Sequence, residues 1–270
     1  MMLSYLEVLR IPNAFMSVIA VIVAVILVGF YNPYQILIAC LAVFLFSGGG
    51  MAINDYFDYE ADKINKPKRT LPAGKISKKN ILIYSLILMI IGNSLVLFLN
   101  YKMLVFSLAN TFLLIAYSWK LKKIILLGNF VVSWLTASIF LFGSLLSGAV
   151  TATILILFLF AFSSTIGREI TKTIEDVEGD KKINARTLPI VAGKNFAGWI
   201  AIIFIIFAVL FSPLPYIFHL LSVNYLYLVT IADIIFLYSC FTVLISPSKS
   251  QKMMKIAMIV ALISFLIGIF

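Results

Sequence analysis

The sequence predicts an all-α polytopic membrane protein, with about nine transmembrane helices around a central cavity. Of its 270 residues, 63% are hydrophobic and only 12% are charged, and the mean hydropathy is +1.10. A soluble domain of this length could not hide so much apolar surface from water. The apolar residues also fall into stretches of about 20, the length that a helix needs to cross the hydrocarbon core.

Nine such stretches follow one another along the chain. Each is close to the length that crosses about 30 Å of hydrocarbon, and we expect the true helix ends to differ by a few residues. The predicted spans are residues 12–30, 35–54, 81–99, 102–119, 124–147, 151–171, 196–212, 224–246 and 253–270.

Lysine and arginine residues set the orientation of these spans. The chain has 21 lysine and arginine residues. If it crosses the membrane at each of the nine spans, all of them except Lys102 fall on the same side. Such residues accumulate in cytoplasmic loops. We therefore expect a multi-pass protein of the cell membrane with a cytoplasmic N-terminus and an external C-terminus. The net charge of +10 reflects this bias, so the expected partner is the lipid bilayer and not nucleic acid.

The tetrapeptide Arg-Thr-Leu-Pro occurs twice, at residues 69–72 and 186–189, each time shortly after an acidic cluster. Because four predicted spans separate the two copies, we interpret them as marks of an internal repeat. The chain would then be one membrane domain. Its two four-helix halves would cover about residues 1–123 and 124–252, with a ninth helix at 253–270. Facing halves would bring their acidic clusters together over one central cavity.

Nine of the 11 acidic residues lie in these two clusters, and each cluster directly follows an apolar span. If the helices continue through the clusters, residues four apart share one face. Stacked carboxylates repel one another unless a cation lies between them, and Mg²⁺ combines one or two carboxylates with water and phosphate oxygens. The clusters therefore predict a cradle that holds a diphosphate through magnesium. The residues with this spacing are Asn54, Asp58 and Asp62 in the first cluster and Lys172, Asp176 and Asp180 in the second.

Each cluster also has a purely structural interpretation. The first could be a solvated helix end whose carboxylates balance the lysines that follow. In the second, Lys172 and Asp176 could form an ordinary helical pair worth a few tenths of a kcal/mol. We favour the functional interpretation, in which Lys172, with Arg168 one turn earlier, contacts the leaving diphosphate.

Further candidates lie at the same predicted membrane face. The segment 117–123 carries three lysines after Tyr117 and Ser118, and one of them could reach a phosphate. Arg10 and Asn13 begin the first span, where a snorkelling arginine and a helix-capping amide are the alternative explanation. His219 is the only histidine and lies near the external face, so histidine metal sites and Ser-His-Asp catalysis are excluded.

These motifs resemble those of the UbiA superfamily of intramembrane prenyltransferases. The resemblance rests on N-D-x-x-D-x-x-x-D at 54–62, the Asp176/Asp180 pair, the Tyr117-Ser118…Lys122 segment and the nine spans, and it covers essentially the whole chain. It implies Mg²⁺ as the cofactor. The implied metal-binding residues are Asn54, Asp58, Asp176 and Asp180, with Asp62 in support. The implied catalytic residues are Asp58, Asp176 and Lys172.

Within this superfamily, residues 167–180 resemble the archaeal digeranylgeranylglyceryl phosphate synthases. The narrower resemblance implies geranylgeranyl diphosphate as the donor and geranylgeranylglyceryl phosphate, a lipid-like phosphorylated acceptor, alkylated on its free hydroxyl to give an ether lipid. Lys122 would join Lys172 at the leaving diphosphate. A phosphorylated acceptor needs its own cationic contact. The implied substrate-binding residues are Lys122, Arg168, Arg69, Arg10, Asn13 and Tyr117.

Three alternatives remain to be weighed. The same machinery could serve an aromatic acceptor, such as a quinone precursor or a porphyrin, although Arg168 stands where ubiquinone-type enzymes usually carry tyrosine. A cation-coupled transporter also uses repeats and acidic residues, but its acids lie near the middle of the membrane, and here only Asp233 lies deep in a span. The D-x-x-D-G-x-x-A-R signature of phosphatidyl-alcohol transferases is absent. Acceptor identity, prenyl chain length and oligomeric state are left open.

Overall fold

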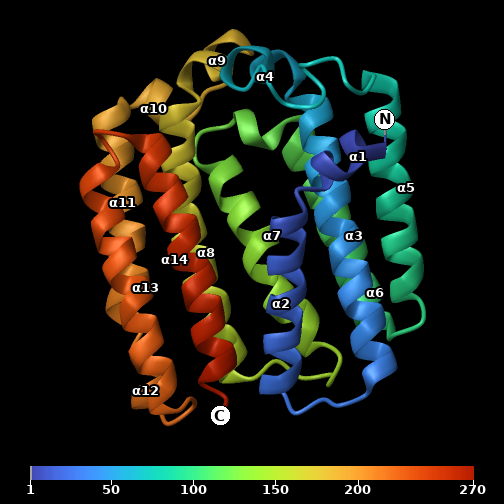
Figure 1. Cartoon of the computed structure of the whole chain (residues 1–270), viewed down its shortest axis with the longest axis vertical. Coiled ribbons are helices and arrows are strands. Elements are labelled where there is room, and N and C mark those ends of the chain that lie inside the picture. The colour runs from blue at the N-terminus through green and yellow to red at the C-terminus, as the bar shows by residue number, and fades with distance from the viewer. Residues whose placement is uncertain (1) are drawn as a thin grey trace.

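The structure, a computed structural model, describes residues 2–270, with the side chain of Met2 excepted. Long helices run roughly parallel and form a bundle, and short helices cover one end of it (Figure 1). The N-terminal helix lies at that end and the C-terminus at the opposite end. The described residues contain helices and no strands, so the predicted all-α fold is confirmed.

Within the described residues, eight helices are long and apolar enough to cross a membrane, and the bent pair α1 and α2 supplies a ninth span. Each of the nine predicted stretches overlaps one of these helices, with ends shifted by a few residues. The spanning helices are α2 (Ile11–Leu27), α3 (Pro33–Phe57), α5 (Lys78–Val96), α6 (Tyr101–Trp119), α7 (Leu127–Ser144), α8 (Ala152–Glu175), α11 (Lys194–Phe211), α13 (Val223–Thr242) and α14 (Pro247–Ile267).

Side-chain caps explain where several of these helices begin. Asn32, Ser77, Asn100 and Thr151 precede α3, α5, α6 and α8, and each accepts a hydrogen bond from a backbone N–H of the first turn. Such residues satisfy donors that a helix start otherwise leaves without partners. The first span is bent by 47° between α1 (Met2–Leu9) and α2, because Arg10 between them has a φ of 45°.

The short helices at the N-terminal end form what we call the cap: α4 (Tyr59–Asn65), the 3₁₀ helix η1 (Leu121–Lys123), α9 (Val177–Lys182) and α10 (Leu188–Val191). Helices α4 and α9 lie side by side across the top of the bundle in Figure 1, although more than 100 residues separate them in sequence. At the opposite end, the described part of the chain forms one short helix, α12 (Leu214–Ile217).

Packing between helices leaves a large cavity in the bundle. Close approach is possible where glycines lie between helices: a Cβ on Gly49 of α3 would lie 3.2 Å from the carbonyl oxygen of Ser85 on α5. Many large apolar side chains point outward instead, including Phe112 and Leu210, as expected for a surface that faces lipid. Residues of α2, α3, α6, α7, α8, α11, α13 and α14 enclose a cavity of about 560 Å³, the large cavity.

Candidate functional site

The first acidic motif lies where α3 meets α4. Helix α3 continues past its predicted end to Phe57, and a break at Asp58 separates it from α4. The helical hydrogen bonds still pass through the break, from Asp58 N–H to the Asn54 carbonyl (2.8 Å) and from Asp62 N–H to the Asp58 carbonyl (2.8 Å). The Asn54 amide donates to the Asp58 carboxylate (2.8 Å), and Lys122 of η1 donates to its other oxygen (2.5 Å). Asn54, Asp58 and Lys122 therefore meet at one point.

The second motif has the same local structure. Helix α8 continues to Glu175, and a break at Asp176 precedes α9. Asp176 and Asp58 have nearly identical backbone angles, φ −87° and ψ 6° against φ −84° and ψ 1°. The Asp180 N–H donates to the Asp176 carbonyl (3.0 Å), and Lys66 donates to the Asp176 carboxylate (2.9 Å). The expectation of two uninterrupted helical columns is wrong in this detail, because each helix breaks at its central aspartate.

Asn65 joins the two motifs. Its amide nitrogen donates to the Asp176 carbonyl, and its amide oxygen accepts from the Gly179 N–H, both at 3.0 Å. Position 179 has no room for a side chain, because a Cβ there would lie 2.2 Å from the Asn65 amide nitrogen. This contact places the first and second acidic clusters at neighbouring positions.

A small cavity of about 70 Å³ lies between the motifs, and Asp58, Asp176, Asp180, Lys122 and Lys172 are among the residues that line it. Burial, with the carboxylates of Asp176 and Asp58 adding to it, raises the pKa of Asp180 to about 7. Burial lowers the pKa of the Lys122 ammonium, and the Asp58 carboxylate opposes this effect. The small cavity therefore concentrates carboxylates that a further cation would stabilise.

This arrangement fits Mg²⁺. Among residues 2–270, no three His, Cys, Asp or Glu side chains converge closely enough to enclose a metal ion by themselves. Mg²⁺ does not require that, because it keeps several waters and usually binds one or two carboxylates together with substrate phosphates. Asp58 and Asp176 present carboxylates to the small cavity, and Asn54 presents an amide oxygen near them. Asp180 lines the same cavity, and its pKa is raised.

Asp62 and two of the predicted arginines form a separate ion-pair group. Asp62 is 5% exposed and accepts from Arg69 at 2.6 Å. Arg69 also lies 3.5 Å from Asp55, which Arg10 contacts in turn. Two cations thus balance two carboxylates here. Asp62 does not line the small cavity, so its supporting role toward a metal stays a prediction.

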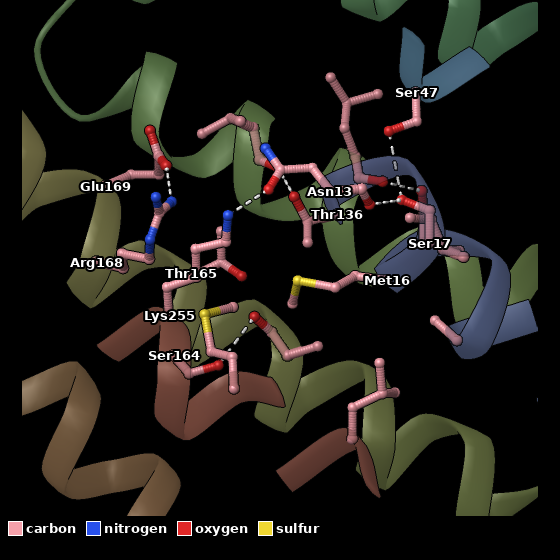
Figure 2. A pocket seen from close by; sticks show the side chains of 18 of the residues that line it. Asn13, Met16, Ser17, Ser47, Thr136, Ser164, Thr165, Arg168, Glu169 and Lys255 are labelled. Atoms are coloured by element: carbon pink, nitrogen blue, oxygen red, sulfur yellow. Dashed lines mark hydrogen bonds and ion pairs between the residues drawn. The ribbon is translucent and has the colours of Figure 1, made fainter. Parts of the chain in front are cut away.

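The large cavity adjoins the small one, because Tyr117, Glu169 and Lys172 line both. Near the cap its wall is polar and charged, and Figure 2 shows Asn13, Thr165, Arg168 and Lys255 pointing into it. Farther down, the wall is mainly apolar and aromatic. The aromatic lining residues are Phe46, Phe106, Phe140, Phe142, Phe160, Phe236 and Phe265.

An ion-pair group centred on Glu169 lies where the two cavities meet. Glu169 accepts from Arg168 at 2.7 Å and from Lys172 at 3.1 Å. A second Arg168 nitrogen donates to Gln251 of α14 (3.1 Å), so Arg168 connects α8 to α14. Deep in the large cavity, Asp233 accepts from the Ser212 hydroxyl at 2.6 Å, which supplies the partner that an acid inside a span needs.

All of the predicted site residues lie at the cap or at the end of the bundle beneath it. The sequence interpretation missed Lys66, Asn65, Glu169 and Lys255. Lys66 and Lys255 were treated only as markers of the cytoplasmic side. The spacing of Gln251 and Lys255 by four residues was the available signal for a cavity-facing stripe on α14. Nothing local in the sequence distinguishes Asn65 from an ordinary polar residue at the end of a helix.

Comparisons with known proteins agree with this geometry. The chain is 42% identical over 269 residues to a curated digeranylgeranylglyceryl phosphate synthase of Methanosphaera stadtmanae, covering 98% of both chains. It superposes with a TM-score of 0.76 on a solved digeranylgeranylglyceryl phosphate synthase at 38% identity, covering 99% of this chain and 98% of the other. A UbiA homologue of Archaeoglobus fulgidus, bound to GPP and Mg²⁺, shares the fold with a TM-score of 0.67 at 17% identity, covering 98% of this chain and 99% of the other.

The model of the UbiA prenyltransferase family matches residues 14–266, which include every spanning helix in whole or in part. Together with the full-length relatives, this match confirms the resemblance in the motifs. The protein is a multi-pass membrane prenyltransferase, and the chain belongs to the UbiA prenyltransferase family.

Proposed function

We propose that this protein transfers a geranylgeranyl group from geranylgeranyl diphosphate to the free hydroxyl of geranylgeranylglyceryl phosphate and releases diphosphate. The observation that carries the proposal is the arrangement of two cavities, an acidic one under the cap and an apolar one in the bundle, which share Tyr117, Glu169 and Lys172. An allylic diphosphate has the matching shape, with a charged head and a long apolar tail. The full-length relatives named digeranylgeranylglyceryl phosphate synthase support this choice of substrates.

Magnesium is the proposed cofactor, and Asn54, Asp58, Asp176 and Asp180 would hold it. Bound Mg²⁺ would neutralise negative charge that grows on the departing diphosphate. The relative that was bound to GPP and Mg²⁺ supports the use of this ion in the fold. Asp58 and Asp176 already hold cations, Lys122 and Lys66, at 2.5 and 2.9 Å, so the same oxygens are directed at positions where positive charge is stable.

The chain's own residues would act on both reactants. Lys122 and Lys172 would place positive charge beside the leaving group as the bond from C1 to the diphosphate oxygen breaks and its electrons move to that oxygen. The aromatic wall of the large cavity would exclude water and face the allylic cation with its ring surfaces. The acceptor hydroxyl would then attack C1 and lose its proton, for which the released diphosphate is a nearby base.

We also propose how the chain is organised in the membrane. The end of the bundle that bears the cap, in and around which most of the lysines lie, would face the cytoplasm. The end with α12 and the C-terminus would lie outside. The two halves, 1–123 and 124–252, would be related by an internal repeat. The matching breaks at Asp58 and Asp176 support the repeat, since each joins a long helix to a short cap helix.

The proposal is tested with purified protein, radiolabelled geranylgeranyl diphosphate, Mg²⁺ and a panel of acceptors. We expect a labelled product and pyrophosphate with geranylgeranylglyceryl phosphate. A chelator should abolish turnover, and added Mg²⁺ should restore it. A product only with 4-hydroxybenzoate, homogentisate or haem would reject the proposed acceptor. Solute movement in sealed vesicles with no pyrophosphate released would reject prenyl transfer by this protein.

A further inference from the structure

One lysine of α14 differs from its neighbours in where it points. Lys255 lines the large cavity together with Gln251 and Met258 of the same helix face, whereas Lys252, one turn away, is exposed at the surface. Lys255 donates to the Asn13 side chain of α2 at 2.5 Å. Among residues 2–270 it forms no ion pair, because no carboxylate lies within reach of its ammonium group. Its charge is therefore available to a ligand.

The surrounding wall carries an excess of positive charge. Arg168, Lys172 and Lys255 are three cations, and the Glu169 carboxylate, shared by the first two, is their one acidic partner. The arginines of the neighbouring ion-pair group do not add to this excess, because Arg10 and Arg69 are balanced by Asp55 and Asp62. An excess of about two positive charges matches a phosphate monoester, which carries about −1.5 to −2 at neutral pH.

Two polar groups in the same wall lack partners. Thr165 lies one turn before Arg168 on α8, is 3% exposed, and lines the large cavity. Neither its hydroxyl nor the Nε atom of Arg168 has a hydrogen-bond partner among the described residues. Buried polar atoms are almost always paired, so these two atoms remain available to a hydrogen-bonding ligand. Figure 2 shows both residues at the wall of the large cavity.

This part of the wall lies apart from the small cavity, where the donor diphosphate is proposed to bind. Arg168, Thr165 and Lys255 line the large cavity and not the small one, whereas Lys172 lines both. A phosphate bound by the first three would lie on the α14 side of Lys172, with the acidic cap on the other side. One anion on each side of Lys172 is what a reaction between a prenyl diphosphate and a second phosphorylated lipid requires.

We infer that Lys255, Arg168 and Thr165 bind a phosphate monoester carried on an apolar tail, and that Lys255 determines the preference for a phosphorylated acceptor. This inference rests on the proposed function. Arg168 and Lys255 supply the charge, Thr165 donates a hydrogen bond, and Gln251 and Asn13 hold the two cations in place. The acceptor tail extends into the apolar part of the large cavity, and its free hydroxyl faces the donor C1.

The test compares the acceptor with its dephosphorylated analogue, geranylgeranylglycerol. In Lys255→Ala, we expect KM for the phosphorylated acceptor to rise at least about tenfold, because a charge-assisted hydrogen bond is lost. KM for geranylgeranylglycerol and for the donor should stay within about twofold. Lys255→Arg should restore the preference, and Lys252→Ala, on the exposed face, is the matched control that should leave every constant unchanged.

Several outcomes would overturn the inference. Equal KM increases for both acceptors, or an increase confined to the donor, would remove Lys255 from the phosphate site. The assay is run first in phospholipid-free micelles and then with added phosphatidic acid. An effect of Lys255→Ala that appears only with phosphatidic acid would assign the site to a membrane lipid. Thermal unfolding of each variant, with Lys255→Gln as a milder change, identifies misfolding. Wild-type protein that makes no product with the phosphorylated acceptor would reject the proposed function itself.

Discussion

Replacement of Gly179 by alanine should separate the two halves of the acidic cap. The new Cβ would lie 2.2 Å from the Asn65 amide nitrogen and 2.6 Å from its Cγ, whereas ordinary contacts begin near 3.4 Å. Asn65 cannot shift slightly to make room, because its amide is held at both ends by 3.0 Å hydrogen bonds to residues 176 and 179. The side chain must leave the interface between α4 and α9, and both bonds are lost.

The expected magnitude follows from those two bonds. Each contributes about 1 kcal/mol, so closure of the cap loses about 2 kcal/mol. At 1.4 kcal/mol per factor of ten, the closed arrangement becomes about 30-fold less populated relative to open ones. If the closed cap is the form that binds Mg²⁺, the Mg²⁺ concentration for half-maximal turnover should rise by up to about 30-fold.

The assay is a Mg²⁺ titration of pyrophosphate release in four proteins: wild type, Gly179→Ala, Asn65→Ala and the double variant. Asn65→Ala removes the same two bonds and should have a similar effect. It also removes the atoms that the new methyl group meets, so the double variant should be no worse than either single one. Thermal unfolding in detergent serves as the control for misfolding. Additive losses in the double variant, or an unchanged Mg²⁺ requirement in Gly179→Ala, would refute the reasoning.

Three further predictions concern charged residues of the site. Asp58→Asn and Asp176→Asn should each lower turnover at least about 100-fold. The melting temperature should change little, because the two side chains are partly exposed, 22% and 16%. Near-normal pyrophosphate release by both variants would contradict the magnesium cradle. Lys172→Ala should lower kcat more than it raises the acceptor KM in steady-state kinetics, and the reverse pattern would move Lys172 to the acceptor site. Arg69→Ala should lower the free energy of unfolding by about 2 to 3 kcal/mol, because Asp62 loses its partner. Adding Asp62→Asn to this variant should recover part of the lost stability. No recovery in the double variant would show that the broken ion pair is not the cause.

Most of the fold could be predicted from the sequence, because span length and hydropathy are local properties. The helix ends were less well defined. Helices α3 and α8 run past their predicted ends to Phe57 and Glu175, since the polar residues of the motifs continue a helix as readily as apolar ones do. The breaks at Asp58 and Asp176 could not be predicted, because the hydrophobic pattern that indicates helix continuity ends before these residues.

The location of the candidate site could be predicted from the sequence, but the pairing of its residues could not. Clustered acids that follow apolar spans predict a cation-assisted site, because isolated carboxylates beside hydrocarbon are costly. The same sequence shows Lys66, Lys252 and Lys255 as equivalent lysines on one side of the membrane. Only the packed structure shows that Lys66 contacts Asp176 and that Lys255 enters the large cavity.

The sequence by itself determined that this is a membrane protein, where its spans lie and which end of the bundle carries the charge. It also predicted that the two acidic motifs come together, and both line the small cavity. Each of these properties is set by residues close together along the chain, through hydrogen bonding within a helix and transfer from water to lipid. The tertiary structure decided which lysine neutralises which aspartate, that Asn65 joins the two motifs, and that α14 supplies a cation to the large cavity. Those contacts join residues that are 64 to 242 positions apart, so they depend on how the helices pack and leave no local pattern in the sequence.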